Sequence, residues 1–168
     1  MGNTQLDVQS LINMGESELQ KLFDCLNNEY YNNELPKVQI TFEDANITTF
    51  GMYYAESNKI VITYLCVKKG YLQIIDTLHH EMIHLYCNVN NIEDTYGRYH
   101  NENFKNECRK RGFTFDSRPL VNIGWSKARL KKKTIKLIDT WDIDVELFNQ
   151  LKDVVKMDVN KHLSKMFG

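Results

Sequence analysis

The chain has 168 residues, of which 42% are hydrophobic and 26% are charged, a composition that predicts a single globular domain. No apolar run approaches the roughly 20 residues that a bilayer-spanning helix needs, and we expect no membrane partner. The net charge of −1 hides an asymmetry, because twelve basic and three acidic residues lie between Arg98 and Lys136. That stretch predicts a surface that faces a polyanion on an otherwise acidic body.

The N-terminal stretch lacks a basic segment and an apolar segment, so it does not resemble a secretion signal. The four cysteines are scattered, without any C-x-x-C pair: Cys25, Cys66, Cys87 and Cys108. This spacing excludes a four-cysteine zinc ribbon and predicts free thiols. We therefore expect a cytoplasmic protein.

The first predicted helix begins with Ser17 as N-cap and ends before Pro36. Its apolar face is formed by Leu19, Leu22, Phe23, Leu26 and Tyr30. A half-buried strand is expected over residues 38–42, because apolar and polar side chains alternate there. Residues 49–64 then predict a β-hairpin around the turn ESNK.

A second, largely buried helix is predicted from about Tyr71 to Asn88, and a third from about His100 to Arg111, closed by Gly112. An irregular stretch and a basic run precede a last amphipathic helix over about residues 145–167. A helix, a short and mainly antiparallel sheet, and further helices together predict an α+β fold.

The sequence HEMIH, from His80 to His84, matches the H-E-x-x-H pattern. Histidines four residues apart lie about 40° apart around a helix, so both imidazoles can bind one zinc ion. Glu81 lies about 100° around the helix from His80, which places its carboxylate beside the metal, where it can accept a proton from a zinc-bound water. His79 has no partner in the matching register, and we assign it a structural or supporting role.

Catalytic zinc needs a third protein ligand and an open position. His100 is the strongest candidate, because it follows His84 by sixteen residues, after a loop and at the start of the next helix. His162 is the only other histidine left. Carboxylates also remain open as candidates: Glu93, Asp94, Glu102 and Glu107. The metzincin pattern is excluded, since it requires glycine and histidine where this chain has Cys87 and Asn90.

The chain resembles the SprT-like metallopeptidases, which include the Spartan proteases of DNA–protein crosslinks, in five ordered segments: LNNEYYNNELP, ITF, FGMYYAESNKIVIT, TLHHEMIHLY and YGRYHNENFKNECRKRGF. The resemblance covers about residues 19–113. Its last segment corresponds to the family's H-G-x-x-F signature through His100, Asn101 and Phe104. Asn101 replaces the usual glycine, and asparagine tolerates unusual backbone angles better than most residues.

This resemblance implies a compact zincin fold of the minigluzincin type, with one Zn²⁺ ion. It implies Glu81 as the general base and three zinc ligands: His80, His84 and His100. We expect residues 1–120 to form the metallopeptidase domain. Residues 121–168 are then a basic segment and an amphipathic helix packed on the same domain.

The resulting hypothesis is a zinc-dependent endopeptidase in which Glu81 passes a proton from water to the leaving amine. Its substrate is a protein, and by the resemblance one that is bound or crosslinked to DNA, which would make it a DNA-repair hydrolase. Tyr96 and Tyr99 are candidates to donate a hydrogen bond to the oxyanion, although ordinary packing is the favoured interpretation of both.

The run SKARLKKK contains five basic residues: Lys127, Arg129, Lys131, Lys132 and Lys133. Such a run can bind the phosphates of single-stranded DNA while an aromatic side chain such as Trp125 stacks on a base. A solvated basic face is an equally weighted alternative. Two further functions also stay open, namely a zincin with a dedicated protein substrate and no DNA role, and a non-catalytic zinc module that binds nucleic acid or protein.

Overall fold

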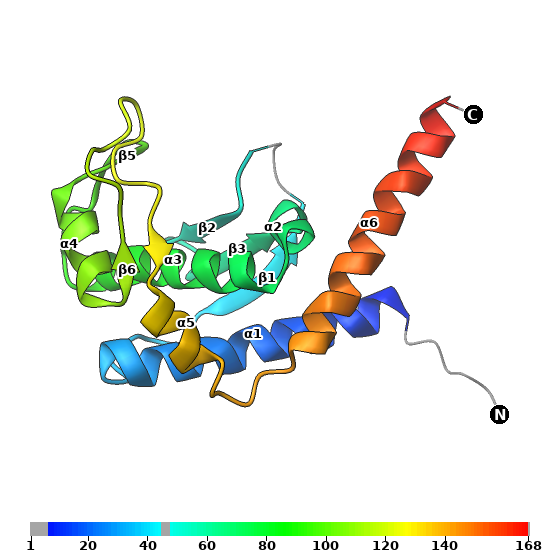
Figure 1. The fold of residues 1–168 in the computed structure, drawn as a ribbon, viewed down its shortest axis with the longest axis horizontal. Coiled ribbons are helices and arrows are strands. Elements are labelled where there is room, and N and C mark those ends of the chain that lie inside the picture. Colours follow the sequence, from blue (N-terminus) through cyan, green and yellow to red (C-terminus); the bar gives the residue numbers. More distant parts are fainter. Residues whose placement is uncertain (1–6, 45–47, 168) are drawn as a thin grey trace.

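The computed structural model describes residues 7–44 and 48–167 of the chain. In chain order its elements are α1 (Val8–Tyr31), β1 (Gln39–Glu43), β2 (Gly51–Tyr54), β3 (Lys59–Thr63), α2 (Tyr64–Lys69), α3 (Tyr71–Val89), β4 (Thr95–Tyr96), β5 (Tyr99–His100), α4 (Glu102–Lys110), β6 (Phe113–Thr114), β7 (Arg129–Leu130), α5 (Lys132–Ile138) and α6 (Val145–Phe167). Figure 1 shows this order in space. The predicted α+β class is confirmed.

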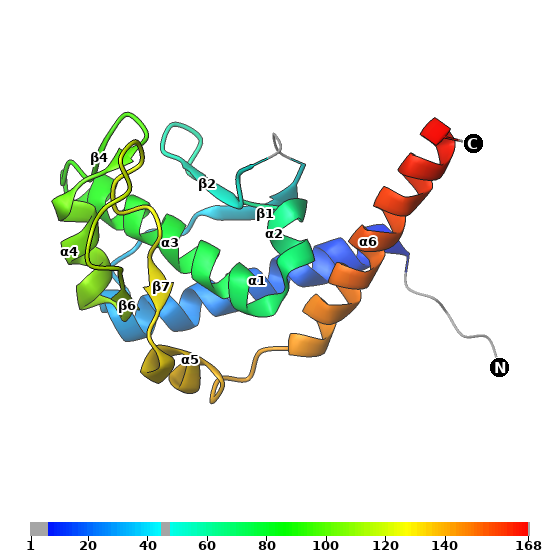
Figure 2. The same cartoon turned by 45° about the horizontal axis from the view of Figure 1, so that its top comes forward.

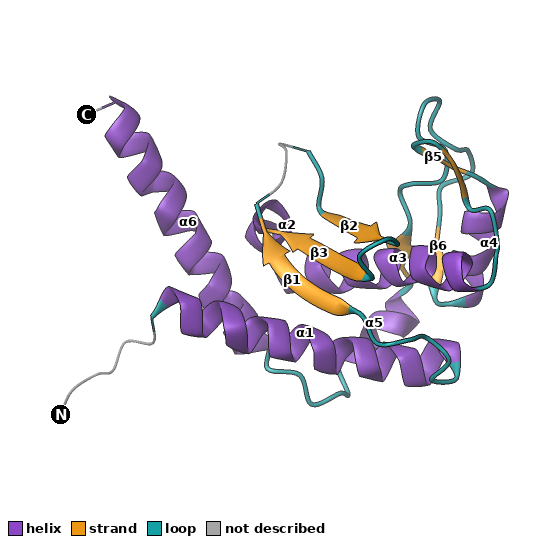
Figure 3. Ribbon diagram, turned by 180° about the vertical axis from the view of Figure 1, so that it is seen from behind, coloured by secondary structure: helices purple, strands orange, loops and turns teal. Residues whose placement is uncertain are grey.

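The largest sheet has three strands in the order β1-β3-β2 and packs on α1 and α3 (Figure 3). The predicted hairpin is present, because β2 and β3 pair antiparallel, whereas β1 joins the other edge of β3 in parallel. The sheet is therefore mixed. Alternating side chains of β1 and β3 enter the core: Ile40, Phe42, Ile60 and Ile62.

Helix α1 begins nine residues before the predicted cap at Ser17, which is exposed within the helix. The Asp7 carboxylate caps it by accepting a hydrogen bond from the Ser10 N–H at 2.7 Å. Gly15, just before the predicted cap, is buried in the helix, where an added Cβ would lie 2.5 Å from Leu151 Cδ1. Glycine lets the Leu151 side chain of α6 pack close to α1 at this point.

The C-terminal part of the chain returns to the first helices. Helix α6 packs on α1 and α2 through its first turns, where Phe148 is fully buried and its ring stacks on that of Tyr71 at 5.3 Å. The rest of α6 projects from the body of the fold (Figure 2). Among the described residues, no helix is both long enough and apolar enough to span a membrane.

Candidate metal centre

Helix α3 carries the whole HEMIH sequence. It begins after Gly70, whose φ of +103° reorients the chain between α2 and α3. One face of α3 is fully buried in the core through side chains three and four residues apart, among them Leu78, Met82 and Leu85. The same periodicity puts His80 and His84 together on another face, with Glu81 beside them.

His100 reaches this face from the short β4–β5 hairpin, in which it pairs with Thr95. The chain turns at Gly97, and α4 starts directly after the hairpin with Asn101 as its N-cap. The Asn101 side chain accepts hydrogen bonds from the N–H groups of Asn103 and Phe104. Its φ of −88° is ordinary, so asparagine replaces the usual glycine here without needing an unusual backbone angle, and its side chain serves as a cap.

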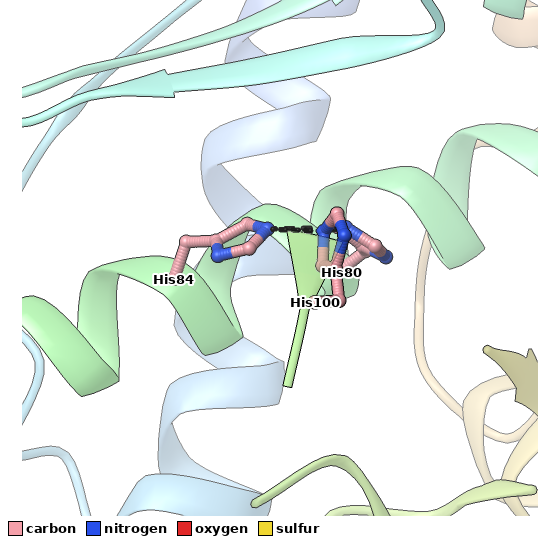
Figure 4. Close-up of side chains that lie close together, drawn as sticks. All are labelled: His80, His84 and His100. Atoms are coloured by element: carbon pink, nitrogen blue, oxygen red, sulfur yellow. Dashed lines mark hydrogen bonds between the residues drawn. The ribbon is translucent and has the colours of Figure 1, made fainter. Parts of the chain in front are cut away.

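The three imidazoles converge on one point (Figure 4). The Nε2 atoms of His80, His84 and His100 lie 3.2 to 3.3 Å from one another. Two nitrogens that bind a tetrahedral zinc ion at about 2.0–2.1 Å lie about 3.3–3.4 Å apart. The triangle thus has the size of one face of a zinc coordination tetrahedron, and among the described residues these three form the group that is able to hold a metal ion.

The electrostatic surroundings favour neutral rings at two of the three positions. Burial, together with the neighbouring histidines, lowers the pKa of His80 well below its usual value. Burial is also the main cause that lowers the pKa of His100 to about 4. A neutral imidazole is the form that binds a metal ion, so both rings are ready to bind without losing a proton.

His84 differs because a carboxylate holds its other ring nitrogen. Its Nδ1 lies 2.6 Å from Oδ2 of Asp94. Burial lowers the pKa of His84, but the Asp94 hydrogen bond and the charge of Glu81 outweigh it and leave the pKa raised. A carboxylate in this position fixes the ring so that Nε2 faces the metal. Asp94 therefore supports a ligand, where the sequence had offered it as a candidate third ligand.

Phe104 forms the apolar wall behind the three imidazoles. Its ring centroid lies 4.5 to 4.9 Å from those of His80, His84 and His100, and its side chain is fully buried. This packing limits the rotation of the imidazole rings and excludes water from behind them. The phenylalanine of the sequence signature thus has a physical role in the site.

Glu81 is buried beside the triangle, under strand β2. Burial raises the pKa of its carboxyl, while His84 and the Tyr53 N–H act in the opposite direction. A raised pKa makes the carboxylate a better proton acceptor. The strand comes this close because Gly51 has no side chain, since an added Cβ would lie 2.5 Å from Thr77 Cγ2 and 3.3 Å from Glu81 Cγ.

A cleft of about 640 Å³ opens beside the triangle, and it is lined by His80 and His100 but not by His84. Its lining comes from segments far apart in the sequence: Thr48, Thr49, Phe50, Gly51, Gln73, Asp76, Thr77, His80, Glu81, Arg98, His100, Ile123, Ser126, Lys127, Ala128 and Arg129. Lys127 and Arg129 in this wall were predicted as nucleic-acid contacts, but the sequence did not predict that residues 123–129 lie beside the metal centre, because no periodicity or motif pairs them with α3.

Several sequence candidates lie elsewhere. His79 is fully buried against Tyr30 and Phe113, and burial lowers its pKa to about 3. This placement agrees with the structural role assigned to it. Tyr96 and Tyr99 line a separate shallow hollow instead of the cleft, so the structure does not support either as an oxyanion donor.

The remaining candidates for the third ligand lie outside the triangle. Glu107 forms an ion pair with Arg111 at 2.6 Å, and Glu102 accepts a hydrogen bond from the Trp125 indole at 2.8 Å. Glu93 is exposed, with only its carbonyl engaged by Asn101 and Asn103. His162 lies in the part of α6 whose side chains are outside the described residues.

The five basic candidates divide into two groups. Lys127 and Arg129 line the cleft, whereas the lysines at the start of α5 do not: Lys131, Lys132 and Lys133. All five side chains are exposed. Trp125 is only 7% exposed, with Lys105 Nζ 3.9 Å from the centroid of its ring, so the expectation that this ring is free to stack on a base is wrong.

Comparison with protein families finds one that accounts for this arrangement. The model of the SprT-like family matches residues 19–120, close to the extent of the resemblance seen in the sequence. No curated protein and no solved structure matches the chain. The matched residues include all three histidines of the triangle and Glu81. The chain belongs to the SprT-like family, a family of zincin-like metallopeptidases.

Proposed function

We propose that the protein is a zinc-dependent endopeptidase in which Glu81 is the general base. The observation that carries this proposal is the convergence of three Nε2 atoms within 3.3 Å at a cleft that Glu81 also lines. A zinc ion bound there supplies a Lewis acid that lowers the pKa of a water and polarises a carbonyl. Three protein ligands leave one position open, as catalytic sites require and structural zinc sites do not.

The side chains of the site supply metal binding, orientation of a metal-binding ring and proton transfer. His80, His84 and His100 hold the metal, and Asp94 fixes the ring of His84. Glu81 accepts the proton of the attacking water and returns it to the leaving amine. Strand β2 is an edge strand whose Gly51 lines the cleft, and an edge strand offers unpaired backbone groups to an extended peptide.

The test compares Glu81→Gln with the wild-type protein in a casein digestion assay, alongside zinc content. We expect cleavage to fall by about 10²–10⁴-fold, because the amide cannot accept the proton. Zinc content should be unchanged, because Glu81 is not a ligand. A chelator should abolish wild-type cleavage, and added zinc should restore it. The exposed Glu93→Gln variant is the matched control, and cleavage by Glu81→Gln at the control's rate would refute the proposal.

A second proposal concerns the substrate, which we infer to be protein held near single-stranded nucleic acid, in keeping with DNA repair. Its support is that Lys127 and Arg129 line the same cleft as His80, and that three exposed lysines continue from them. Phosphates bound along this surface would bring an associated protein to the metal centre. The competing function is that of a peptidase with a dedicated protein substrate and no DNA role.

Binding of a single-stranded oligonucleotide at two salt concentrations separates these two functions. The triple variant with alanine at Lys131, Lys132 and Lys133 should bind more weakly, and its affinity should depend less steeply on salt. The logarithmic slope should fall by about 0.7 for each phosphate that the variant no longer neutralises. The control replaces three exposed lysines elsewhere: Lys21, Lys37 and Lys69. Equal affinities of the two triple variants would exclude a specific role for the basic segment.

A further inference from the structure

The three proposed ligands are not held in place equally. His80 and His84 belong to a long buried helix, and Asp94 also fixes the ring of His84. His100 belongs to a strand of two residues in an isolated hairpin, and such a hairpin is marginally stable on its own. Its buried Nδ1 has no hydrogen-bond partner among the described residues. The position of this ring therefore depends on its backbone and on its packing against Phe104.

A second segment holds that backbone through both the N–H and the carbonyl of His100. We name residues 120–125 the clamp segment. The His100 N–H donates a hydrogen bond to the Ile123 carbonyl at 3.2 Å, and the Trp125 N–H donates one to the His100 carbonyl at 3.0 Å. The segment is itself closed by two hydrogen bonds of 2.9 Å between the backbones of Leu120 and Gly124.

Gly124 lies at the centre of this contact. Its φ is +60°, and an added Cβ would lie 2.1 Å from the His100 carbonyl oxygen and 2.9 Å from Tyr99 Cε1. Backbone atoms cannot move aside as the end of a flexible side chain can. A methyl group here would therefore push the clamp segment and His100 apart.

Trp125 fixes the clamp segment to helix α4. Its indole Nε1 donates to Oε1 of Glu102 at 2.8 Å, and its ring contacts Phe115 edge-on at 5.7 Å. Helix α4 also carries Phe104, which packs against the three imidazoles. The clamp segment is thus anchored to the same element that forms the wall of the metal centre.

We propose that the clamp segment is a positioning device for the third metal ligand, with Gly124 and Trp125 setting zinc affinity through His100. The match to the SprT-like family ends at residue 120, so this device lies almost wholly beyond the matched part of the chain. The inference rests on the proposed zinc site but not on peptide hydrolysis.

The test measures zinc affinity by competition with a chromophoric chelator. Gly124→Ala should bind zinc about 10–100-fold more weakly, as is typical when a group that orients a ligand is removed. The matched control is Gly97→Ala, because Gly97 also has a positive φ, of +59°, but nothing lies within 4 Å of its added Cβ. Gly97 lies in the turn of the hairpin that carries His100, so Gly97→Ala measures the effect of backbone strain alone, and its loss of zinc affinity should be clearly smaller than that of Gly124→Ala.

A double-mutant cycle with His100→Ala shows whether Gly124 acts through His100. In the His100→Ala background, Gly124→Ala should cause no further loss of affinity. The proposal is overturned if Gly124→Ala binds zinc as tightly as Gly97→Ala, or if its loss is the same with and without His100.

Trp125→Phe provides a second variant in case Gly124→Ala does not fold. It keeps an aromatic ring but removes the donor to Glu102, and we expect about a fivefold loss of zinc affinity that also disappears in the His100→Ala background. A loss that persists in that background would overturn the proposal. Casein cleavage is measured separately. If the variants change zinc affinity as expected but the wild-type protein does not cleave casein, the peptidase function is refuted and the proposal for the clamp segment stands.

Discussion

Two of the three histidines that are proposed to bind zinc differ in the contacts of their Nδ1 atoms. Asp94 contacts Nδ1 of His84 at 2.6 Å, whereas Nδ1 of His100 has no partner among the described residues. The carboxylate gives His84 a fixed ring orientation and a more basic nitrogen. The effect of removing the Asp94 contact from His84 should therefore be measurable as a loss of zinc affinity.

Asp94→Asn should lower zinc affinity by about 10–100-fold, because the neutral amide is a weaker acceptor for the His84 ring N–H. The measurement is the same chelator competition at constant pH. The neighbouring Glu93→Gln variant makes the same change of charge at an exposed side chain and should leave the affinity unchanged. Equal affinities for the two variants would show that the Asp94 contact does not support the metal centre.

The roles of single residues were predictable where one helix fixes them. The register of His80 and His84 follows from the 3.6-residue period alone, and the separation of His79 from them follows from the same period. Asp94 was visible only as one of several carboxylates near His100. No local sequence pattern distinguishes a carboxylate that binds a metal from one that hydrogen-bonds a metal-binding histidine. The difference depends on where the β4–β5 hairpin places the carboxylate.

At the scale of elements, a half-buried carboxylate joins helix α3 to strand β7. Oδ2 of Asp76 accepts a hydrogen bond from the Leu130 N–H at 3.3 Å, and Asp76 also lines the cleft. Burial raises the pKa of this carboxyl to about 6, against the smaller opposing effects of that hydrogen bond and of Arg129. The hydrogen bond between Asp76 and Leu130 positions one wall of the cleft. Ionisation of the Asp76 carboxyl therefore lowers the stability of the folded protein.

This cost predicts how stability depends on pH. In the unfolded chain Asp76 loses its proton near pH 3.8, whereas in the folded protein it keeps the proton until about pH 6. The folded state thus loses stability as the pH rises between these values, and the full penalty is present above them. Asp76→Asn, which keeps an acceptor for Leu130, should raise the free energy of unfolding by about 1–3 kcal/mol at neutral pH and by almost nothing near pH 4.

Urea denaturation of the metal-free protein at the two pH values checks this prediction. Asp153→Asn, at an exposed position of α6, is the control and should change the free energy of unfolding by less than about 0.5 kcal/mol at either pH. A stabilisation by Asp76→Asn that is the same at both pH values would mean that ionisation of the carboxyl is not its cause.

The longer elements followed from the sequence, whereas α2, α5 and the two-residue strands β4, β5, β6 and β7 were not predicted. Helix α3 and the β2–β3 hairpin lie where periodicity and turn chemistry placed them. Helix α1 begins earlier than predicted and runs through Gly15, although glycine is unfavourable inside a helix, because here it makes room for Leu151. That reason involves a contact between residues far apart in the chain, which propensity cannot reveal.

At the scale of the whole molecule, the cleft is assembled from four separate parts of the chain. Residues 48–51, the face of α3, the β4–β5 hairpin and residues 123–129 meet only in the folded protein. The sequence predicted the histidines that converge from two of these parts, but not the walls between them. The predicted domain boundary at residue 120 and the cytoplasmic location stay predictions, although the four cysteines are free as expected.

The central claim is an open zinc centre formed by three histidines, and X-ray absorption at the zinc K-edge tests it most directly. The protein should bind one zinc ion with three imidazole nitrogens at about 2.0–2.1 Å and one further light ligand. His100→Ala should lower the imidazole count by one. A sulfur ligand at about 2.3 Å, or a closed set of four imidazoles, would contradict the account.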